Sequence, residues 1–163
     1  ILGRKGKKIA GRTVEKYISL LHSAFIFYPV RRYDVKGKQL LKTLEKNYII
    51  DMGFRNLLLG YRDADRGHIL ENIVFLELLR RDYSVYIGKV NDYVVDFIAE
   101  KPSDKIYIQV TESMQSPETR ERELRPLRLI NDNYEKLVLS MDRNFINSYD
   151  GIKSFDLIDW LLM

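Results

Sequence analysis

The chain of 163 residues contains no cysteine, two histidines, four prolines and one tryptophan. The lack of cysteine excludes disulfides and thiolate metal sites, and it is compatible with the reducing cytoplasm. His22 and His68 lack the paired spacing of a zinc site. No apolar run approaches the roughly 18 residues that cross a bilayer, and no signal peptide is recognisable, so we expect a cytoplasmic protein without membrane contact.

Positive charge is concentrated toward the amino-terminal end. Residues 1–46 contain 12 Lys or Arg against 3 Asp or Glu, whereas the remaining residues contain 15 against 20. A basic segment of this kind is a candidate for contact with phosphate groups, but such clusters are also found on solvated surfaces and tails. The length and the 45% of hydrophobic residues indicate one domain, with or without a small appendage. Because the first residue is Ile1, we expect a fragment of a longer protein.

The basic segment predicts a helix followed by a hairpin. Apolar residues recur at helical spacing at Val14, Ile18, Leu21 and Phe25. This stripe predicts a helix over residues 14–25 that Thr13 caps and that packs on the core. Gly37 predicts a tight turn with positive φ. A helix and a basic hairpin suggest the end of a winged helix, whose wing would contact a nucleic-acid backbone through Arg31, Arg32, Lys36 and Lys38.

The rest of the sequence predicts an α/β domain. We expect a strand at 48–50, a short helix before Gly60, a long helix over 67–83, strands at 84–88, 92–100 and 105–111, a charged helix over 117–130, a strand at 135–142 and a helical end at 154–163. This order predicts a mixed sheet of three hairpin-connected strands, extended by a crossover and flanked by helices. Pro126 predicts a kink or break in the charged helix. Its alternating Arg and Glu residues, including Glu123, predict a solvated face, with contact to phosphate groups as the alternative.

The motifs that carry a family resemblance are LLKTLEKNYIIDMGFRNLLLG, GHILENIVFLELLRRDYSVYIGKV, VVDFIAEK, KIYIQVTES, PETRERELRPL, EKLVLSMD and GIKSFDLIDWLL. Together they resemble the uncharacterised C-terminal domain of a family of prokaryotic AAA-type ATPases, whose core is similar to the PD-(D/E)xK restriction-endonuclease fold. The resemblance implies a basic winged-helix-like segment at 1–46 and a nuclease-like domain at 47–163. It also implies an upstream ATPase domain, outside this sequence, that binds ATP.

The resemblance also assigns candidate site residues. It places the helical acid of such nucleases at Glu71, in the first turn of the long helix, and the first strand acid at Asp96. Gln109 stands where the second acid is expected, and Thr111 stands where the lysine is expected. In nucleases of this fold, carboxylates hold Mg²⁺ and the lysine helps to position the nucleophile.

These departures weaken the expected site. Glu71, Asp96 and Gln109 could provide at most a weak Mg²⁺ site. A cation at the position of Thr111 is missing, and Lys89, Lys101 or Lys105 would replace it only by reaching in from another element. If the site is degenerate, Glu71 and Asp96 are either remnants that still bind a ligand or structural acids held by local donors.

Three functions remain open. The leading hypothesis is an accessory domain of an AAA-type ATPase that binds nucleic acid or a partner without cutting. The first alternative is a Mg²⁺-dependent DNA nuclease with a rearranged site. The second is a protein-protein interaction module that contacts the ATPase domain of the same protein, and a homo-oligomer is compatible with all three.

Overall fold

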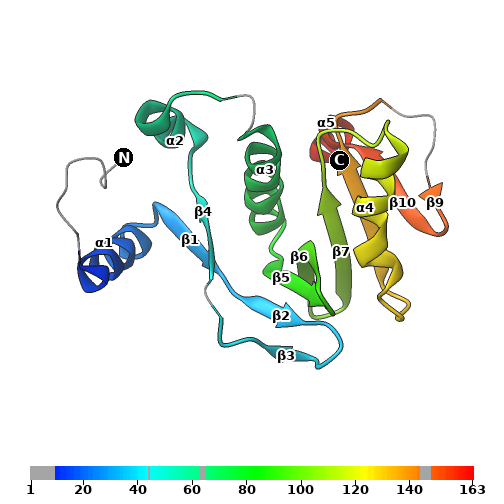
Figure 1. Ribbon diagram of the computed structural model, residues 1–163, viewed down its shortest axis with the longest axis horizontal. Coiled ribbons are helices and arrows are strands. Elements are labelled where there is room, and N and C mark those ends of the chain that lie inside the picture. Colours follow the sequence, from blue (N-terminus) through cyan, green and yellow to red (C-terminus); the bar gives the residue numbers. More distant parts are fainter. Residues whose placement is uncertain (1–9, 44, 63–64, 144–147) are drawn as a thin grey trace.

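The computed structural model describes residues 10–43, 45–62, 65–143 and 148–163, so the basic positions within residues 1–9 lie outside the described part (Figure 1). The helices are α1 (Gly11–Ser23), α2 (Met52–Leu59), α3 (Arg66–Arg80), α4 (Pro117–Arg128) and α5 (Leu157–Leu162). The strands are β1 (Phe27–Val30), β2 (Arg32–Asp34), β3 (Gln39–Leu40), β4 (Lys46–Ile49), β5 (Ser84–Val90), β6 (Tyr93–Lys101), β7 (Asp104–Val110), β8 (Glu135–Ser140), β9 (Ser148–Tyr149) and β10 (Ile152–Asp156). Among these helices, none has the length and apolar character needed to cross a bilayer.

The described strands form an eight-stranded mixed sheet in the order β3-β2-β5-β6-β7-β8-β10-β9. Strands β5, β6 and β7 are antiparallel neighbours, and α4 connects β7 to the parallel strand β8. The predicted three hairpin-connected strands with a crossover are therefore confirmed, and the chain is a mixed α/β protein with helices on its sheet.

Helices cover both faces of this sheet. One core cluster joins α3 and α5 to the sheet, and the other joins α4 to the opposite face. Along β7, Ile106, Ile108 and Val110 face the α3 side, whereas Tyr107 faces the α4 side. This alternation follows from the two-residue period of a strand, and it places Gln109 on the α4 side.

The amino-terminal strands extend beyond the main sheet and also enter it. Strands β1 and β4 form a separate antiparallel pair, in which Tyr48 stacks on Phe75 of α3 with ring centroids 4.4 Å apart. The predicted hairpin exists as β2 and β3, but β2 pairs in parallel with β5 of the main sheet. The predicted border between residues 46 and 47 falls inside β4. The basic segment and the α/β core thus share strands.

The helix predicted at 14–25 is present as α1, but two details were wrong. Its N-cap is Ala10 rather than Thr13, and the helix contains no buried residue. Val14 is 44% exposed, and Phe25, which follows the helix, is 72% exposed. The helical spacing identified an apolar face correctly, but no described element covers that face as a core would.

The turn of the hairpin differs from the expected one. The positive φ occurs at Lys38 (49°) and not at Gly37. The Asp34 carboxylate accepts hydrogen bonds from the N–H groups of Lys36 and Gly37, both at 3.1 Å. A Cβ on residue 37 would lie 2.8 Å from an Asp34 carboxylate oxygen, so a larger residue there would displace this carboxylate.

Two expectations for the carboxyl-terminal half need correction. Pro126 does not break α4, because it lies buried inside the helix, which continues to Arg128. The stretch expected to form only a terminal helix contains strand β10 before α5 begins at Leu157. Asp156 separates the two elements, because its side chain accepts hydrogen bonds from the N–H groups of the first helical turn.

Candidate functional site

Strands β6 and β7 separate at the position of Asp96. Their ladder extends only as far as the pair Phe97 and Ile108. Beyond it, the Asp96 carboxylate accepts a hydrogen bond from Val110 N–H at 2.8 Å, and the Gln109 side-chain oxygen accepts one from Asp96 N–H at 3.4 Å. Side chains thus replace the backbone ladder where the two strands open.

A bulge on the other side of β6 adds to this distortion. Tyr86 of β5 pairs with Ile98, whereas Gly88 pairs with Val95. Two residues of β6, Asp96 and Phe97, therefore stand opposite the single residue between Tyr86 and Gly88. Bulges of this kind re-aim side chains and are common beside functional sites.

A hollow of about 420 Å³ lies at this opening between α3 and α4. We call it the acidic hollow; its lining residues are Glu71, Asp92, Tyr93, Val94, Asp96, Gln109, Val110, Arg122, Glu123 and Pro126. Three of the four positions assigned by the resemblance, Glu71, Asp96 and Gln109, line it together. The fourth, Thr111, does not; its buried hydroxyl donates a hydrogen bond to the carbonyl of Ser113 at 3.4 Å.

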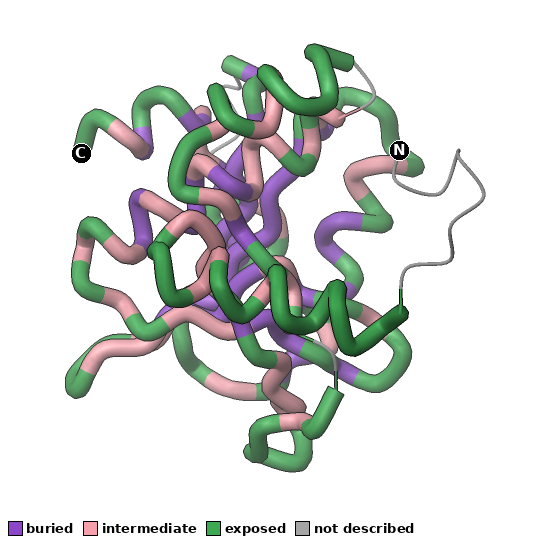
Figure 2. Tube along the Cα trace, turned by 90° about the vertical axis from the view of Figure 1, so that its left-hand side faces the viewer, coloured by how far each residue is buried: buried purple, intermediate pink, exposed green. Residues whose placement is uncertain are grey.

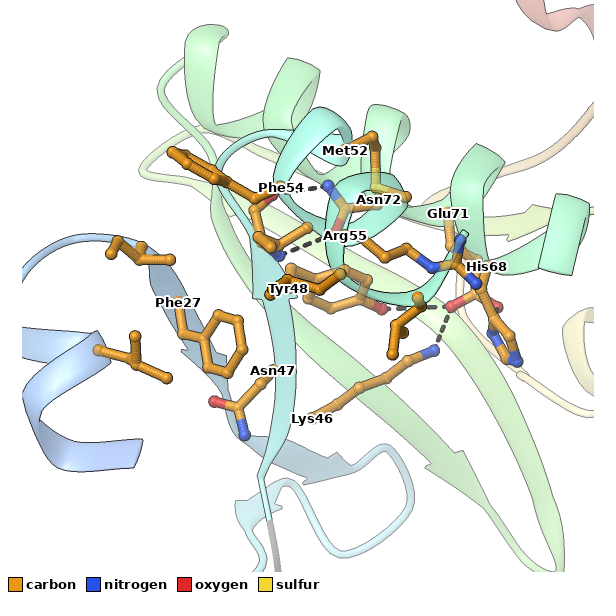
Figure 3. A pocket seen from close by; sticks show the side chains of 15 residues that line it. Phe27, Lys46, Asn47, Tyr48, Met52, Phe54, Arg55, His68, Glu71 and Asn72 are labelled. Atoms are coloured by element: carbon orange, nitrogen blue, oxygen red, sulfur yellow. Dashed lines mark hydrogen bonds and ion pairs between the residues drawn. The ribbon is translucent and has the colours of Figure 1, made fainter. Parts of the chain in front are cut away.

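Glu71 has two partners on β4. The Lys46 ammonium pairs with its carboxylate, and the Tyr48 hydroxyl donates to the same oxygen at 3.3 Å (Figure 3). The prediction that Glu71 lies in the first helical turn was wrong, because α3 begins at Arg66 and its first turn contains no acid. Lys46 and Tyr48 of strand β4, rather than the dipole of helix α3, hold this carboxylate.

The acidic surroundings change the protonation of Asp96. Burial and the nearby Glu71 carboxylate raise its pKa from 3.8 to about 7, against the opposing effects of the Val110 N–H and the Lys46 ammonium. The Glu123 carboxylate raises it further. Burial, Glu71 and Asp96 likewise raise the pKa of Tyr48, so its hydroxyl remains a donor. Near neutral pH, Asp96 exists in both protonation states.

Glu123 contributes a carboxylate that the sequence interpretation missed. Its Oε2 atom accepts a hydrogen bond from the Gln109 amide at 2.9 Å, and its Oε1 atom accepts from Arg122 at 2.7 and 3.0 Å. The expectation of a solvated residue was wrong, since Glu123 is 7% exposed. Its position beside Leu124 and four residues before Leu127, on the buried face of α4, was the available signal.

Among the described residues, Lys46 is the lysine that forms an ion pair with a candidate acid, Glu71. None of the three lysines proposed as replacements lines the acidic hollow. Lys105 pairs with Glu100 at 2.7 Å, and Lys101 lies over the Tyr83 ring at 4.2 Å. The lysine that pairs with Glu71 comes from β4, a strand outside the main sheet, and the cation that lines the acidic hollow itself is Arg122.

No cluster of histidine and acidic side chains in the described residues forms a prearranged metal site. Within residues 10–43, 45–62, 65–143 and 148–163, no three His, Asp or Glu side chains converge closely enough to hold a metal ion. Glu71 and Glu123 are instead paired with Lys46 and Arg122. A metal ion bound at Glu71, Asp96 and Gln109 would therefore share the Glu71 carboxylate with Lys46.

The four predicted phosphate-binding cations line two separate hollows. Arg31 and Arg32 line a hollow of about 1100 Å³ that also includes Lys42. Lys36 and Lys38 line another of about 420 Å³. That second hollow also contains Lys105 and the rings of Tyr33, Tyr107 and Tyr134. Both hollows offer positive charge, but the four side chains do not form one continuous site.

Comparison with known proteins yields relatives without an assigned activity. A family described as "Domain of unknown function (DUF8612)" matches residues 3–65. An "Uncharacterized protein" of Haemophilus influenzae is 41% identical over 153 residues, which cover 94% of this chain and 38% of that protein. "Uncharacterized protein MJ1544" of Methanocaldococcus jannaschii is 28% identical over 147 residues, which cover 85% of this chain and 32% of that protein. The chain thus spans well under half of either relative, and no solved structure matches it.

Proposed function

We propose that the chain is a restriction-endonuclease-like accessory domain of an AAA-type ATPase, and that it binds nucleic acid without cutting it. The main support is the acidic hollow, where Glu71, Asp96 and Gln109 meet beside the opening of β6 and β7. These are the positions that the motifs assign to a nuclease site. An ATPase partner would place the domain in the cytoplasm.

The state of the acids supports binding rather than hydrolysis. Mg²⁺ prefers charged oxygen ligands in octahedral geometry. Asp96 is partly protonated at neutral pH, Glu71 is paired with Lys46, and Gln109 is neutral. These three candidate ligands therefore offer little unpaired negative charge to a divalent ion.

Positive charge outside the acidic hollow supports nucleic acid as the ligand. Arg31 and Arg32 on one hollow, and Lys36 and Lys38 on another, offer guanidinium and ammonium groups to a phosphate backbone. Nucleic-acid binding that depends on such contacts weakens steeply with salt.

The test is a binding and cleavage experiment on fluorescently labelled single- and double-stranded DNA. We expect anisotropy to report binding at 50 mM salt that weakens strongly at 200 mM, and we expect intact DNA after incubation with Mg²⁺ or Mn²⁺. Degradation that requires the divalent ion and disappears in Asp96→Asn would contradict the non-cutting proposal. Absence of binding at low salt would contradict the choice of ligand.

A metal-dependent nuclease with a rearranged site is the second candidate. Glu123 brings a carboxylate to Gln109, and Lys46 brings a cation to Glu71, so both missing chemical groups exist nearby. This candidate predicts that Glu123→Gln and Lys46→Met each reduce cleavage by about 10²–10³-fold. Glu121→Gln, on the same helix but exposed, is the matched control and should cleave like the unmodified chain.

A further inference from the structure

The amino-terminal helices expose an unusual amount of apolar surface. Neither α1 nor α2 contains a buried residue. Leu57 and Leu58 of α2 are 83% and 73% exposed, and Leu20 of α1 is 55% exposed. Of the seventeen large hydrophobic residues that are exposed in the described chain, eleven lie between Val14 and Tyr61. The apolar exposure is therefore concentrated in the amino-terminal part of the described chain.

An apolar groove of about 540 Å³ lies in the same region (Figure 3). Its apolar wall is formed by Leu21, Ile26, Phe27, Met52, Phe54 and Leu58. Figure 1 shows α1 and α2 at one end of the molecule, on either side of β1 and β4, and Figure 2 looks at this end and shows much exposed chain. We call this groove, together with the exposed apolar residues of α1 and α2, the α1/α2 face.

The exposed apolar residues of this face indicate an interaction site. Large apolar patches on folded proteins commonly mark such sites. Helices of the length of α1 and α2, 13 and 8 residues, are marginal in water unless an apolar face packs against something. Within the described chain, no element buries a residue of α1 or α2.

We propose that the α1/α2 face docks, within one polypeptide, the part of a longer protein that lies outside these 163 residues. In the relatives from Haemophilus influenzae and Methanocaldococcus jannaschii, the matched region covers only 38% and 32% of the protein. The groove is built mainly from the stretch of residues 3–65 that matches a separate family description. A segment of the same polypeptide is present at high effective concentration, and a permanent interface of this kind is apolar, as this face is.

The charged side chains of the groove do not select its occupant, because they are already paired. Lys46 pairs with Glu71, and Arg55 pairs with Asp65. The occupant is therefore an apolar segment of the remaining polypeptide, and the experiment below separates it from a second copy. This inference is independent of whether the acidic hollow cuts, binds or ignores nucleic acid.

Hydrogen exchange tests the proposal. The 163-residue chain is compared with the complete Haemophilus influenzae relative, which is 41% identical over the matched region. We expect the segments aligned with α1 and α2 to be protected at least about tenfold more in the complete protein, while the segment of α3 is protected equally in both. Replacing the residues aligned with Leu57 and Leu58 by Asp should remove this protection. Replacing those aligned with Ile158 and Leu162, which are 45% and 81% exposed, is the matched control and should not.

Three outcomes would overturn the proposal. Equal, low protection of α1 and α2 in both proteins would show that the rest of the polypeptide leaves the face open. Protection in the 163-residue chain that appears together with a dimer in analytical ultracentrifugation would identify a second copy as the occupant. Protection in the complete relative that is lost on dilution to its monomer would place the covering segment in another molecule.

Discussion

The prediction that follows most directly from the acidic hollow concerns Asp96→Asn. Asparagine keeps a side-chain oxygen that can accept the hydrogen bond from Val110 N–H, but it cannot ionise. The substitution therefore removes a charge that burial, Glu71 and Glu123 disfavour, and it changes little else in shape. We expect the variant to be more stable than the unmodified chain at pH 8 and equally stable at pH 4.

The sign and size follow from the raised pKa. The native state holds the Asp96 proton up to a pH of about 7, whereas the unfolded chain releases it near 3.8. The stabilisation that the protonated form provides is fully present below pH 3.8, decreases as pH rises toward 7, and is absent above that value. At 1.36 kcal/mol per pH unit, the total loss is about 4 kcal/mol at most. For a chain of this size, that corresponds to a difference in Tm of up to about 16 °C.

Urea unfolding of both proteins at pH 4, 5.5 and 8 in EDTA measures this difference directly, because the contributions of all other groups largely cancel between them. The gap in the free energy of unfolding should widen with pH in favour of Asp96→Asn. Asp92→Asn, an exposed position on the same hollow, should change stability by less than about 0.5 kcal/mol at each pH. A gap that is the same at pH 4 and pH 8, or a variant that is less stable at pH 8, would refute the assigned cause.

Three further predictions concern charged groups. Lys46→Met leaves the Glu71 carboxylate without its cation, so the free energy of unfolding at pH 8 should fall by about 1–3 kcal/mol. Urea unfolding measures this change, and an unchanged free energy would contradict a stabilising Lys46–Glu71 pair. Glu123→Gln removes one of the charges that raise the pKa of Asp96, so carbon NMR titration of the Asp96 carboxyl should show a lower pKa. The third substitution replaces four cations of the two basic hollows by Ala: Arg31, Arg32, Lys36 and Lys38. The slope of DNA affinity against salt concentration should flatten by roughly 0.9 log unit per lost phosphate contact. An unchanged slope would show that these four residues do not contact the DNA backbone.

The sheet was predictable because its strands carry an unambiguous pattern. Runs of β-branched and aromatic residues between turns predict β5, β6 and β7, and the charged helix after them predicts a crossover to β8. Strand β10 was missed because it continues directly into α5, and Asp156 is the sole separator in the sequence. The exposure of α1 was missed for another reason: periodicity shows that a helix has an apolar face but not which segment covers it.

The site was predictable only where a motif fixes positions along the chain. Glu71, Asp96 and Gln109 do line one hollow. The groups that hold them are remote in sequence: Lys46 is 25 residues from Glu71, and Glu123 is 14 residues from Gln109. No local pattern specifies such pairs, because they depend on how β4 packs beside α3 and how α4 crosses the sheet.

Glu71 connects the two surfaces for which functions are proposed. It lines the acidic hollow, and it also lines the apolar groove together with its partner Lys46. The Lys46 ammonium lowers the pKa of Asp96, so its position affects the charge of the hollow. A segment docked in the groove would contact the wall that contains the Lys46–Glu71 pair. Covering the α1/α2 face would therefore also remove water from this pair and strengthen it, because the attraction between opposite charges grows as the local dielectric falls.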